Sequence, residues 1–221
     1  MQYQNETVTL NRGDYTTCTI NLHGATVTSW RFEDEELLFV SRQSKFSGLL
    51  QVRGGMAFVF PHFGMWFFGP QHGFGRNLRW NLEEGPAVLK DSGDVYATFS
   101  LRSSAYTDSM WNFKFDITYR VTLCEKEIKF EVFIENSSKH FPFEFSILQH
   151  SLFKVPDVTK CSLIGFKNIM YRDETTGTKD MDPVILAPSM KDLKLEIGKH
   201  YEKDINVWNP WAEMSKSIHD L

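Results

Sequence analysis

The most constraining feature of this sequence is a strict alternation of apolar and polar residues over positions 111–123, WNFKFDITYRVTL. An alternation of period two is typical of a β-strand with one buried face. A polar segment, CEKE at 124–127, follows, and the alternation then resumes over 128–134. Two such runs around a short polar turn predict an antiparallel hairpin. The alternating apolar residues are Trp111, Phe113, Phe115, Ile117, Tyr119, Val121 and Leu123, then Ile128, Phe130, Val132 and Ile134.

Further short strand-like runs occur along the chain, and segments rich in Gly, Pro, Asn and Asp separate them. No sustained helical periodicity precedes residue 205, so we expect an all-β fold, an antiparallel β-sandwich or barrel, in a single domain over 1–221. Asn209 as N-cap and Pro210 at the first helical position predict a short C-terminal helix. The predicted strands cover 6–10, 15–22, 25–30, 95–101 and 145–155, and the predicted turns 11–14, 83–86, 91–94 and 135–139.

Composition and charge exclude several classes of partner. The 221 residues carry a net charge of −4 and no Lys/Arg-rich run, so we expect no nucleic acid or membrane partner. The N-terminus lacks a signal-peptide pattern, and no apolar run reaches the roughly 20 residues of a membrane helix. Cys18, Cys124 and Cys161 form no CxxC pair and no metal-ligand cluster with histidine. Reduced thiols in a cytoplasmic protein without a metal are the expectation.

Two arginines lie beside glycines. Arg53 precedes Gly54 and Gly55 in VRGGMAFVFP, and Arg76 closes QHGFGR at 71–76. A pair of guanidinium groups can hold a phosphate or a carboxylate through forked hydrogen bonds, and glycine lets the backbone approach a ligand. The alternative is that each arginine covers apolar surface or pairs with one of the 28 acidic residues. A P-loop motif is absent from the sequence.

Two histidines have a context that suits chemistry. His72 lies in PQHGFG, next to the aromatic-rich segment 60–70 that looks like core, and His150 lies in the strand-like SILQHSLFKV. Imidazole can exchange a proton near neutral pH, which suits an acid–base role. The alternative is a structural histidine whose hydrogen bonds are satisfied within a strand. No serine or cysteine has the pattern of a nucleophile elbow.

Four motifs occur together in one order: RGGMAFVFPHFG at 53–64, QHGFGRNLRW at 71–80, LQHSLF at 148–153 and VWNPWAEMSKSIHDL at 207–221. Together they resemble the glucose-6-phosphate 1-epimerase family, the hexose-6-phosphate mutarotases of the galactose mutarotase-like superfamily. The resemblance implies a large antiparallel β-sandwich with a sugar cleft on one sheet. It also implies interconversion of the α and β anomers of a hexose 6-phosphate, by a monomer that needs no cofactor.

The resemblance implies a role for each matching residue. His150 would be the catalytic acid, and Arg53 and Arg76 would bind the substrate, chiefly its phosphate. Gln71 would hydrogen-bond the sugar, and His72 would line the cleft. The family's sugar-binding aspartate best matches Asp182 in MDPVILAP, with Asp173 in MYRDETTG as a competitor.

The sequence departs from the family pattern in several places. Gln149 stands where an apolar residue is usual, Leu152 where a tyrosine is usual, and His62 where another residue is common. The family's general base is a glutamate on a final strand after VWNPW, and no glutamate of this sequence matches it. We therefore expect the final strand or strands of the domain to be missing and turnover by this chain to be impaired. The alternatives are a non-catalytic sugar-phosphate-binding protein, or an aldose 1-epimerase acting on unphosphorylated sugars.

Overall fold

The computed structural model describes residues 6–157, except 14, 34, 45, 47–49, 139 and 140, together with the backbone of 170–171 and 185–186. The chain divides into two compact units, Met1–Lys154 and Val155–Leu221. The second unit contains an antiparallel pair formed by β11 (Met170–Tyr171) and β12 (Ile185–Leu186). The expectation of one domain over 1–221 stays a prediction.

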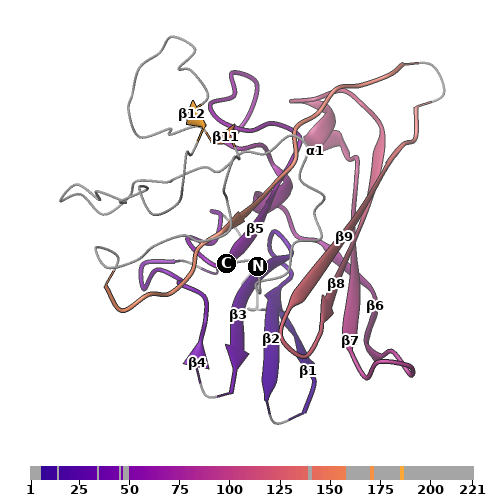
Figure 1. Ribbon diagram of the computed structural model, residues 1–221. Coiled ribbons are helices and arrows are strands. Elements are labelled where there is room, and N and C mark those ends of the chain that lie inside the picture. The colour runs from indigo at the N-terminus through magenta and orange to yellow at the C-terminus, as the bar shows by residue number, and fades with distance from the viewer. Residues whose placement is uncertain are drawn as a thin grey trace. The chain divides into compact units, whose positions relative to one another are not determined.

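The first unit holds two antiparallel sheets (Figure 1). In the first sheet the strand order is β1-β2-β3-β5-β10, and a short β4 (Glu35–Glu36) pairs with β3. Strand β10 comes from far along the sequence, and its Leu148 lies opposite Val59 of β5. This pairing brings the segment that carries His150 next to the segment that follows Arg53. The main strands are β1 (Thr7–Asn11), β2 (Thr16–Asn21), β3 (Thr26–Phe32), β5 (Met56–Val59) and β10 (Leu148–Ser151).

The second sheet is a meander in which each strand pairs with the next, in the order β6-β7-β8-β9. Its longest regular pairing joins β8 to β9 from Phe115 opposite Asn136 to Leu123 opposite Ile128. One short 3-10 helix, η1 (Gly75–Asn77), precedes the sheet, and a one-turn helix, α1 (Ala105–Asp108), follows β7. The strands are β6 (Asn81–Val88), β7 (Val95–Arg102), β8 (Phe115–Leu123) and β9 (Ile128–Asn136).

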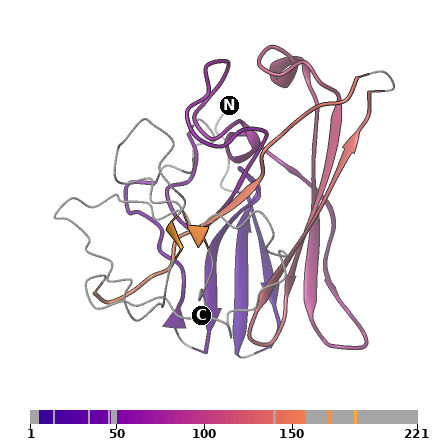
Figure 2. The ribbon, with the colours of Figure 1, turned by 45° about the horizontal axis from the view of Figure 1, so that its top comes forward.

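Aromatic side chains join the two sheets, which lie side by side in Figure 2. Phe58 of β5 stacks on Tyr119 of β8 with ring centroids 5.3 Å apart, and Trp80 meets Phe58 edge-on at 5.6 Å. Phe60 packs against Phe115 at 5.2 Å. All five side chains are almost completely buried. Burying each large apolar side chain contributes roughly 1.5–3 kcal/mol, so this cluster fixes β5 against the second sheet.

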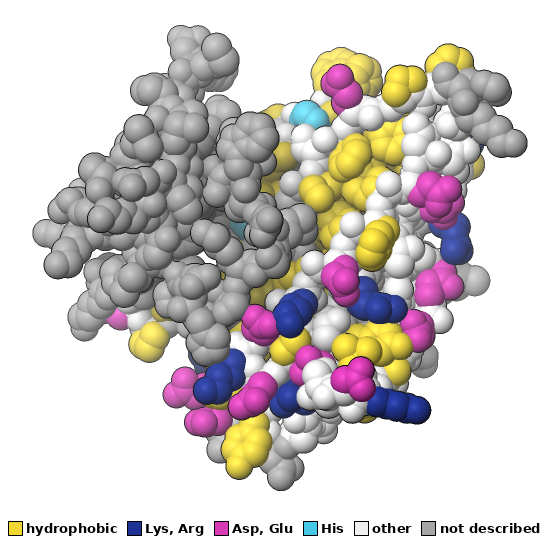
Figure 3. Space-filling view, turned by 45° about the vertical axis from the view of Figure 1, so that its right-hand side comes forward, with side chains coloured by type: hydrophobic (Ala, Val, Ile, Leu, Met, Phe, Trp, Pro, Cys, Tyr) yellow, Lys and Arg dark blue, Asp and Glu magenta, His cyan; other side chains and the backbone are white. Residues whose placement is uncertain are grey.

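The charged surface is mixed in sign. On the face drawn in Figure 3, acidic and basic side chains are interspersed, and apolar side chains gather in the upper part. Described ion pairs include Arg12 with Asp94 at 2.9 Å and Arg102 with Asp116 at 2.7 Å. Among the residues that the structure describes, no helix is long and apolar enough to cross a membrane.

The prediction of an all-β antiparallel fold is confirmed, and so is the hairpin between β8 and β9. The predicted strands at 6–10, 15–22, 25–30 and 95–101 correspond to β1, β2, β3 and β7. Within the predicted strand at 145–155, the structure has the shorter β10 (Leu148–Ser151).

Three local predictions were wrong. The strand predicted from 111 begins only at Phe115, because Trp111 donates its backbone N–H to Thr107 in the turn after α1. The segment 83–86 is not a turn between strands but part of β6, where the register with β7 shifts. An exposed edge strand accommodates glycine and proline at such an irregularity. The aromatic segment 60–70 is only partly core, since Met65, Phe67 and Phe68 are exposed.

Candidate functional site

His72 is held in a defined orientation by Gly64. The backbone N–H of His72 donates to the Gly64 carbonyl oxygen at 2.9 Å, and the Gly64 N–H donates to His72 Nδ1 at 3.0 Å. His72 itself has a positive φ of 64°. Because Nδ1 accepts a hydrogen bond, the proton of the neutral ring is on Nε2. The far edge of the ring can therefore donate a hydrogen bond.

The glycine after His72 allows this loop to sit against β5. Gly73 has φ of 72°, and a Cβ there would lie 2.2 Å from the Phe60 carbonyl oxygen. Gly75 donates its N–H to the same carbonyl at 2.9 Å. The segment 71–76 can therefore pack directly on the end of β5 only with glycine at position 73.

His150 reaches the same region from β10. It lies opposite Ala57 of β5, and its neighbour Gln149 accepts a hydrogen bond from the buried Tyr119 hydroxyl at 3.1 Å. Side chains alternate across a strand, so Gln149 points into the core and His150 points to the opposite face. The His72 and His150 rings meet there with centroids 6.3 Å apart and planes at 62°. The structure thus brings together the two histidines that the sequence analysis selected.

Arg76 has a structural contact in this loop. It lies in η1, is 9% exposed, and its Nη2 donates to the Gln71 carbonyl oxygen at 3.0 Å. The indole N–H of the buried Trp80 donates to the Gly75 carbonyl at 2.8 Å and so fixes the same segment to the core. At the other end of the segment, Gln71 is exposed. The guanidinium of Arg76 therefore ties the two ends of QHGFGR together.

Arg53 differs from Arg76 because it is exposed. Its backbone is fixed by Ser44, whose hydroxyl accepts from the Arg53 N–H at 3.0 Å and donates to its carbonyl at 2.9 Å. Within residues 6–157 as described, its guanidinium makes no hydrogen bond or ion pair that would join it to the histidines. Asp182 and Asp173, the two candidates for a sugar-binding aspartate, lie outside the described residues, as does the predicted helix at 209–221.

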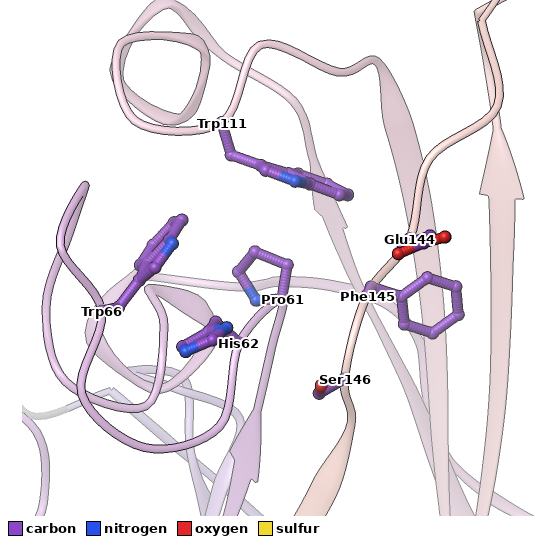
Figure 4. A pocket seen from close by; sticks show the side chains of 7 residues that line it. All are labelled: Pro61, His62, Trp66, Trp111, Glu144, Phe145 and Ser146. Atoms are coloured by element: carbon purple, nitrogen blue, oxygen red, sulfur yellow. The ribbon is translucent and has the colours of Figure 1, made fainter.

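A pocket of about 280 Å³ lies next to the segment 71–76, and Figure 4 shows the residues that line it. We call it the indole pocket. None of the described residues selected from the sequence lines it. Trp66 lies in the aromatic-rich segment 60–70 and Trp111 in the alternating run, but no sequence spacing joins them, and nothing in the sequence marked Glu144. The lining residues are Pro61, His62, Trp66, Trp111, Glu144, Phe145 and Ser146.

No cluster of three or more His, Cys, Asp or Glu side chains suited to a metal ion occurs among the described residues. The two described cysteines are buried. Burial is the main cause that raises the pKa of Cys124 to about 11, and hydrogen bonding with Asp94 adds to it. Burial likewise raises the pKa of Cys18 far above its ordinary value, with a smaller effect of Glu36. Neither thiol is therefore suited to nucleophilic chemistry near neutral pH.

The structure is a β-sandwich of two antiparallel sheets with a pair of neighbouring histidines. Comparison with known proteins shows which family has these features. The model of the aldose 1-epimerase family matches residues 6–209. The chain therefore belongs to the aldose 1-epimerase family.

Two similar proteins carry names that are consistent with membership of this family. A protein of Cenchrus ciliaris named "Putative glucose-6-phosphate 1-epimerase" is 27% identical over 228 residues, which cover 91% of this chain and 69% of the relative. A protein of Escherichia coli K12 with the same name is 28% identical, covering 90% of this chain and 73% of the relative.

Solved structures are also similar. The crystal structure of a putative mutarotase from Salmonella typhimurium matches with a TM-score of 0.62 and 29% identity, over 73% of this chain and 52% of that one. The Slr1438 protein of Synechocystis sp. PCC 6803 matches with a TM-score of 0.68 and 22% identity, over 79% of this chain and 63% of that one. The galactose mutarotase-like fold is therefore shown. The chain spans about half of the length of the Salmonella protein.

Proposed function

We propose that this chain acts as a glucose-6-phosphate 1-epimerase that interconverts the α and β anomers of a hexose 6-phosphate. The observation that carries the proposal is the pair of imidazoles, His72 and His150, on one face of the first sheet with ring centroids 6.3 Å apart. Family membership supplies the reaction class, and the names of the relatives from Cenchrus ciliaris and Escherichia coli suggest the substrate.

Mutarotation needs one proton donor and one proton acceptor. A base removes the proton of the C1 hydroxyl while an acid protonates the ring oxygen, so the bond between C1 and the ring oxygen breaks and C1 becomes an aldehyde. Rotation about the C1–C2 bond followed by the reverse transfers closes the ring on the other face. In this proposal His150 is the acid, and positioned acid–base groups accelerate such steps by about 10²–10⁴-fold.

His72 would position the sugar. The Gly64 N–H donates to Nδ1, which places the proton of the neutral ring on Nε2. A fixed donor near His150 would hold a hydroxyl or the ring oxygen and thereby orient the ring for proton transfer. The base that acts on the C1 hydroxyl is not assigned among the residues that the structure describes.

The phosphate would bind to arginine. Arg53 is exposed in a backbone that Ser44 holds, so its guanidinium is available to an anion. Arg76, whose Nη2 donates to the Gln71 carbonyl oxygen, would contribute to the same site. Such contacts are remote from the bond change and serve to orient the substrate. A sugar-phosphate binder without turnover, or an epimerase of unphosphorylated aldoses, is the competing function.

Exchange NMR on the anomers of glucose 6-phosphate tests the proposed role of His150. His150→Gln keeps an amide for hydrogen bonding but cannot transfer a proton. We expect exchange to fall by about 10²–10⁴-fold, with substrate affinity changed much less. Calorimetry on the same variant supplies the affinity, and the melting temperature reports on folding. If a folded His150→Gln protein exchanges the anomers at nearly the wild-type rate, His150 is not the acid and its role is structural.

A further inference from the structure

The indole pocket has two firm aromatic walls. His62 stacks on Trp66 with ring centroids 5.9 Å apart and planes at 23°, which makes one wall. Trp111 makes the other, and it is held edge-on by Phe60 at 5.4 Å and by Phe143 at 4.8 Å. Figure 4 shows Trp66 and Trp111 on different sides of Pro61. Neither indole N–H has a hydrogen-bond partner within the described part of the chain, so each can donate to a ligand.

The pocket carries a carboxylate, and no described cation pairs with it. Glu144 lies on its rim, and its side chain makes no hydrogen bond or ion pair with any described residue. Among the described residues, no lysine or arginine lines the pocket. Like charges at close range repel, so a phosphate group is disfavoured there. The chemistry of the rim suits hydroxyl groups, which can donate hydrogen bonds to the carboxylate and accept them from the indoles and the Ser146 hydroxyl.

The Ser146 side of the pocket lies away from His150. The Ser146 N–H donates to the Pro61 carbonyl at 2.7 Å, which extends the pairing of β10 with β5 beyond Leu148. An extended chain rises about 3.3 Å per residue, so Ser146 lies about 13 Å from His150 along the strand. A ligand at the Ser146 side of the pocket is therefore out of reach of proton transfer by His150.

We propose that the indole pocket is a second sugar subsite that binds a neutral, unphosphorylated pyranose ring. The apolar C–H face of the ring would lie on an indole, and its hydroxyls would bind Glu144 and Ser146. The volume of about 280 Å³ is near the lower end of small-molecule pockets, roughly 300 Å³, which suits one ring. An aromatic cage for an ammonium ion would instead need several ring faces within about 6 Å of the cation. The two sites would then have opposite preferences, phosphorylated sugar at the histidines and neutral sugar here.

A locked glycoside tests the proposal independently of catalysis. Methyl α-D-glucopyranoside cannot open its ring, so its binding does not depend on the proposed epimerase reaction. We expect titration of a ¹⁵N-labelled chain to shift the indole N–H signals of Trp66 and Trp111, which the variants Trp66→Phe and Trp111→Phe assign. Glu144→Gln should weaken glycoside affinity at least fivefold. Glu125→Gln, an exposed substitution in the turn between β8 and β9, is the matched control and should change nothing.

Competition separates the two sites. Saturating glucose 6-phosphate should leave the glycoside bound, and Glu144→Gln should leave the affinity for glucose 6-phosphate unchanged. Three results would overturn the proposal: an unchanged glycoside affinity in Glu144→Gln, displacement of the glycoside by glucose 6-phosphate, or tighter Glu144-dependent binding of tetramethylammonium than of the glycoside. If His150→Gln abolishes exchange but the glycoside fails to bind, the proposed function stands and the subsite alone is wrong.

Discussion

At the scale of the residue, one backbone hydrogen bond determines what His72 can offer a ligand. Gly64 donates to Nδ1, which leaves the proton on Nε2. A glycine at position 64 was part of the family-like motif, but its contact with His72 eight residues later is visible only in the fold. The pairing of His72 with His150 is likewise a product of the fold, because the two lie 78 positions apart in the sequence and meet at 6.3 Å.

The two arginines should respond differently to removal. Arg53→Ala removes an exposed side chain, so the free energy of unfolding should change by no more than about 0.5 kcal/mol. If Arg53 holds the phosphate, affinity for glucose 6-phosphate should fall by about 1.5–3 kcal/mol while affinity for glucose stays the same. Arg76→Ala leaves the Gln71 carbonyl without its donor and should lower stability by about 1–3 kcal/mol.

Calorimetry with both sugars and urea unfolding of both variants check this prediction. An Arg53→Ala protein with wild-type affinity for glucose 6-phosphate would show that the phosphate binds elsewhere. An Arg76→Ala protein as stable as wild type would contradict the structural role of the Arg76–Gln71 contact.

His23 should make stability depend on pH. Burial lowers its pKa below the ordinary value of 6.5, against a smaller raising effect of the hydrogen bond from Nε2 to the Leu50 carbonyl at 2.9 Å. A group whose pKa is lower in the folded state contributes stability that is present above the unfolded pKa and is lost as pH falls through the folded pKa. We expect the free energy of unfolding to fall as the pH drops below about 6.5, and more steeply in wild type than in His23→Gln. Urea unfolding at several pH values measures both slopes, and equal slopes would contradict the assignment.

At the scale of the element, the segment 71–76 packs against the backbone at the end of β5. Gly73→Ala should be strongly destabilising, because the new Cβ would meet the Phe60 carbonyl at 2.2 Å in addition to the cost of φ of 72°. Gly13→Ala is the matched control, with φ of 81° and nothing within 4 Å. We expect a loss of about 1 kcal/mol at Gly13, the conformational cost alone, and a clearly larger loss at Gly73. Thermal unfolding of the two variants compares them, and similar losses would mean that the loop moves away from β5 without penalty.

Sequence patterns predicted some elements and missed others for physical reasons. The β8–β9 hairpin was predictable because one face of β8 is buried, the same face of β9 is half-buried, and the turn between the strands is short. Strand β5 shows no alternation, since all four of its residues are buried, and periodicity cannot mark such a strand. The irregular pairing of Gly85 and Pro86 within β6 was read as a turn because the same residues form turns elsewhere. Local patterns therefore find half-buried strands better than buried or irregular ones.

The candidate site was predictable in its residues but not in its geometry. The motif around His72 and the strand context of His150 selected both, yet their meeting depends on the pairing of β10 with β5. The indole pocket escaped the sequence analysis because its walls come from Pro61 to Trp66, from Trp111, and from Glu144 to Ser146. Such a set has no sequence spacing to recognise.

At the scale of the whole molecule, the aromatic layer between the sheets supports the site. Phe58 and Tyr119 stack across the interface, and Tyr119 also holds Gln149 beside the outward-facing His150. The sandwich thus connects core packing directly to the strand that carries the proposed acid. Family membership and the shared fold make epimerase chemistry the reaction to test first.

The most direct test is the rate of anomer exchange by the chain itself. Two-dimensional exchange NMR on glucose 6-phosphate, with and without protein, measures that rate against the spontaneous one, and glucose serves as the unphosphorylated comparison. The account predicts that the protein accelerates exchange of glucose 6-phosphate, and does so more than that of glucose. Exchange of glucose 6-phosphate at the spontaneous rate, with the folded protein present and the sugar bound, would contradict it.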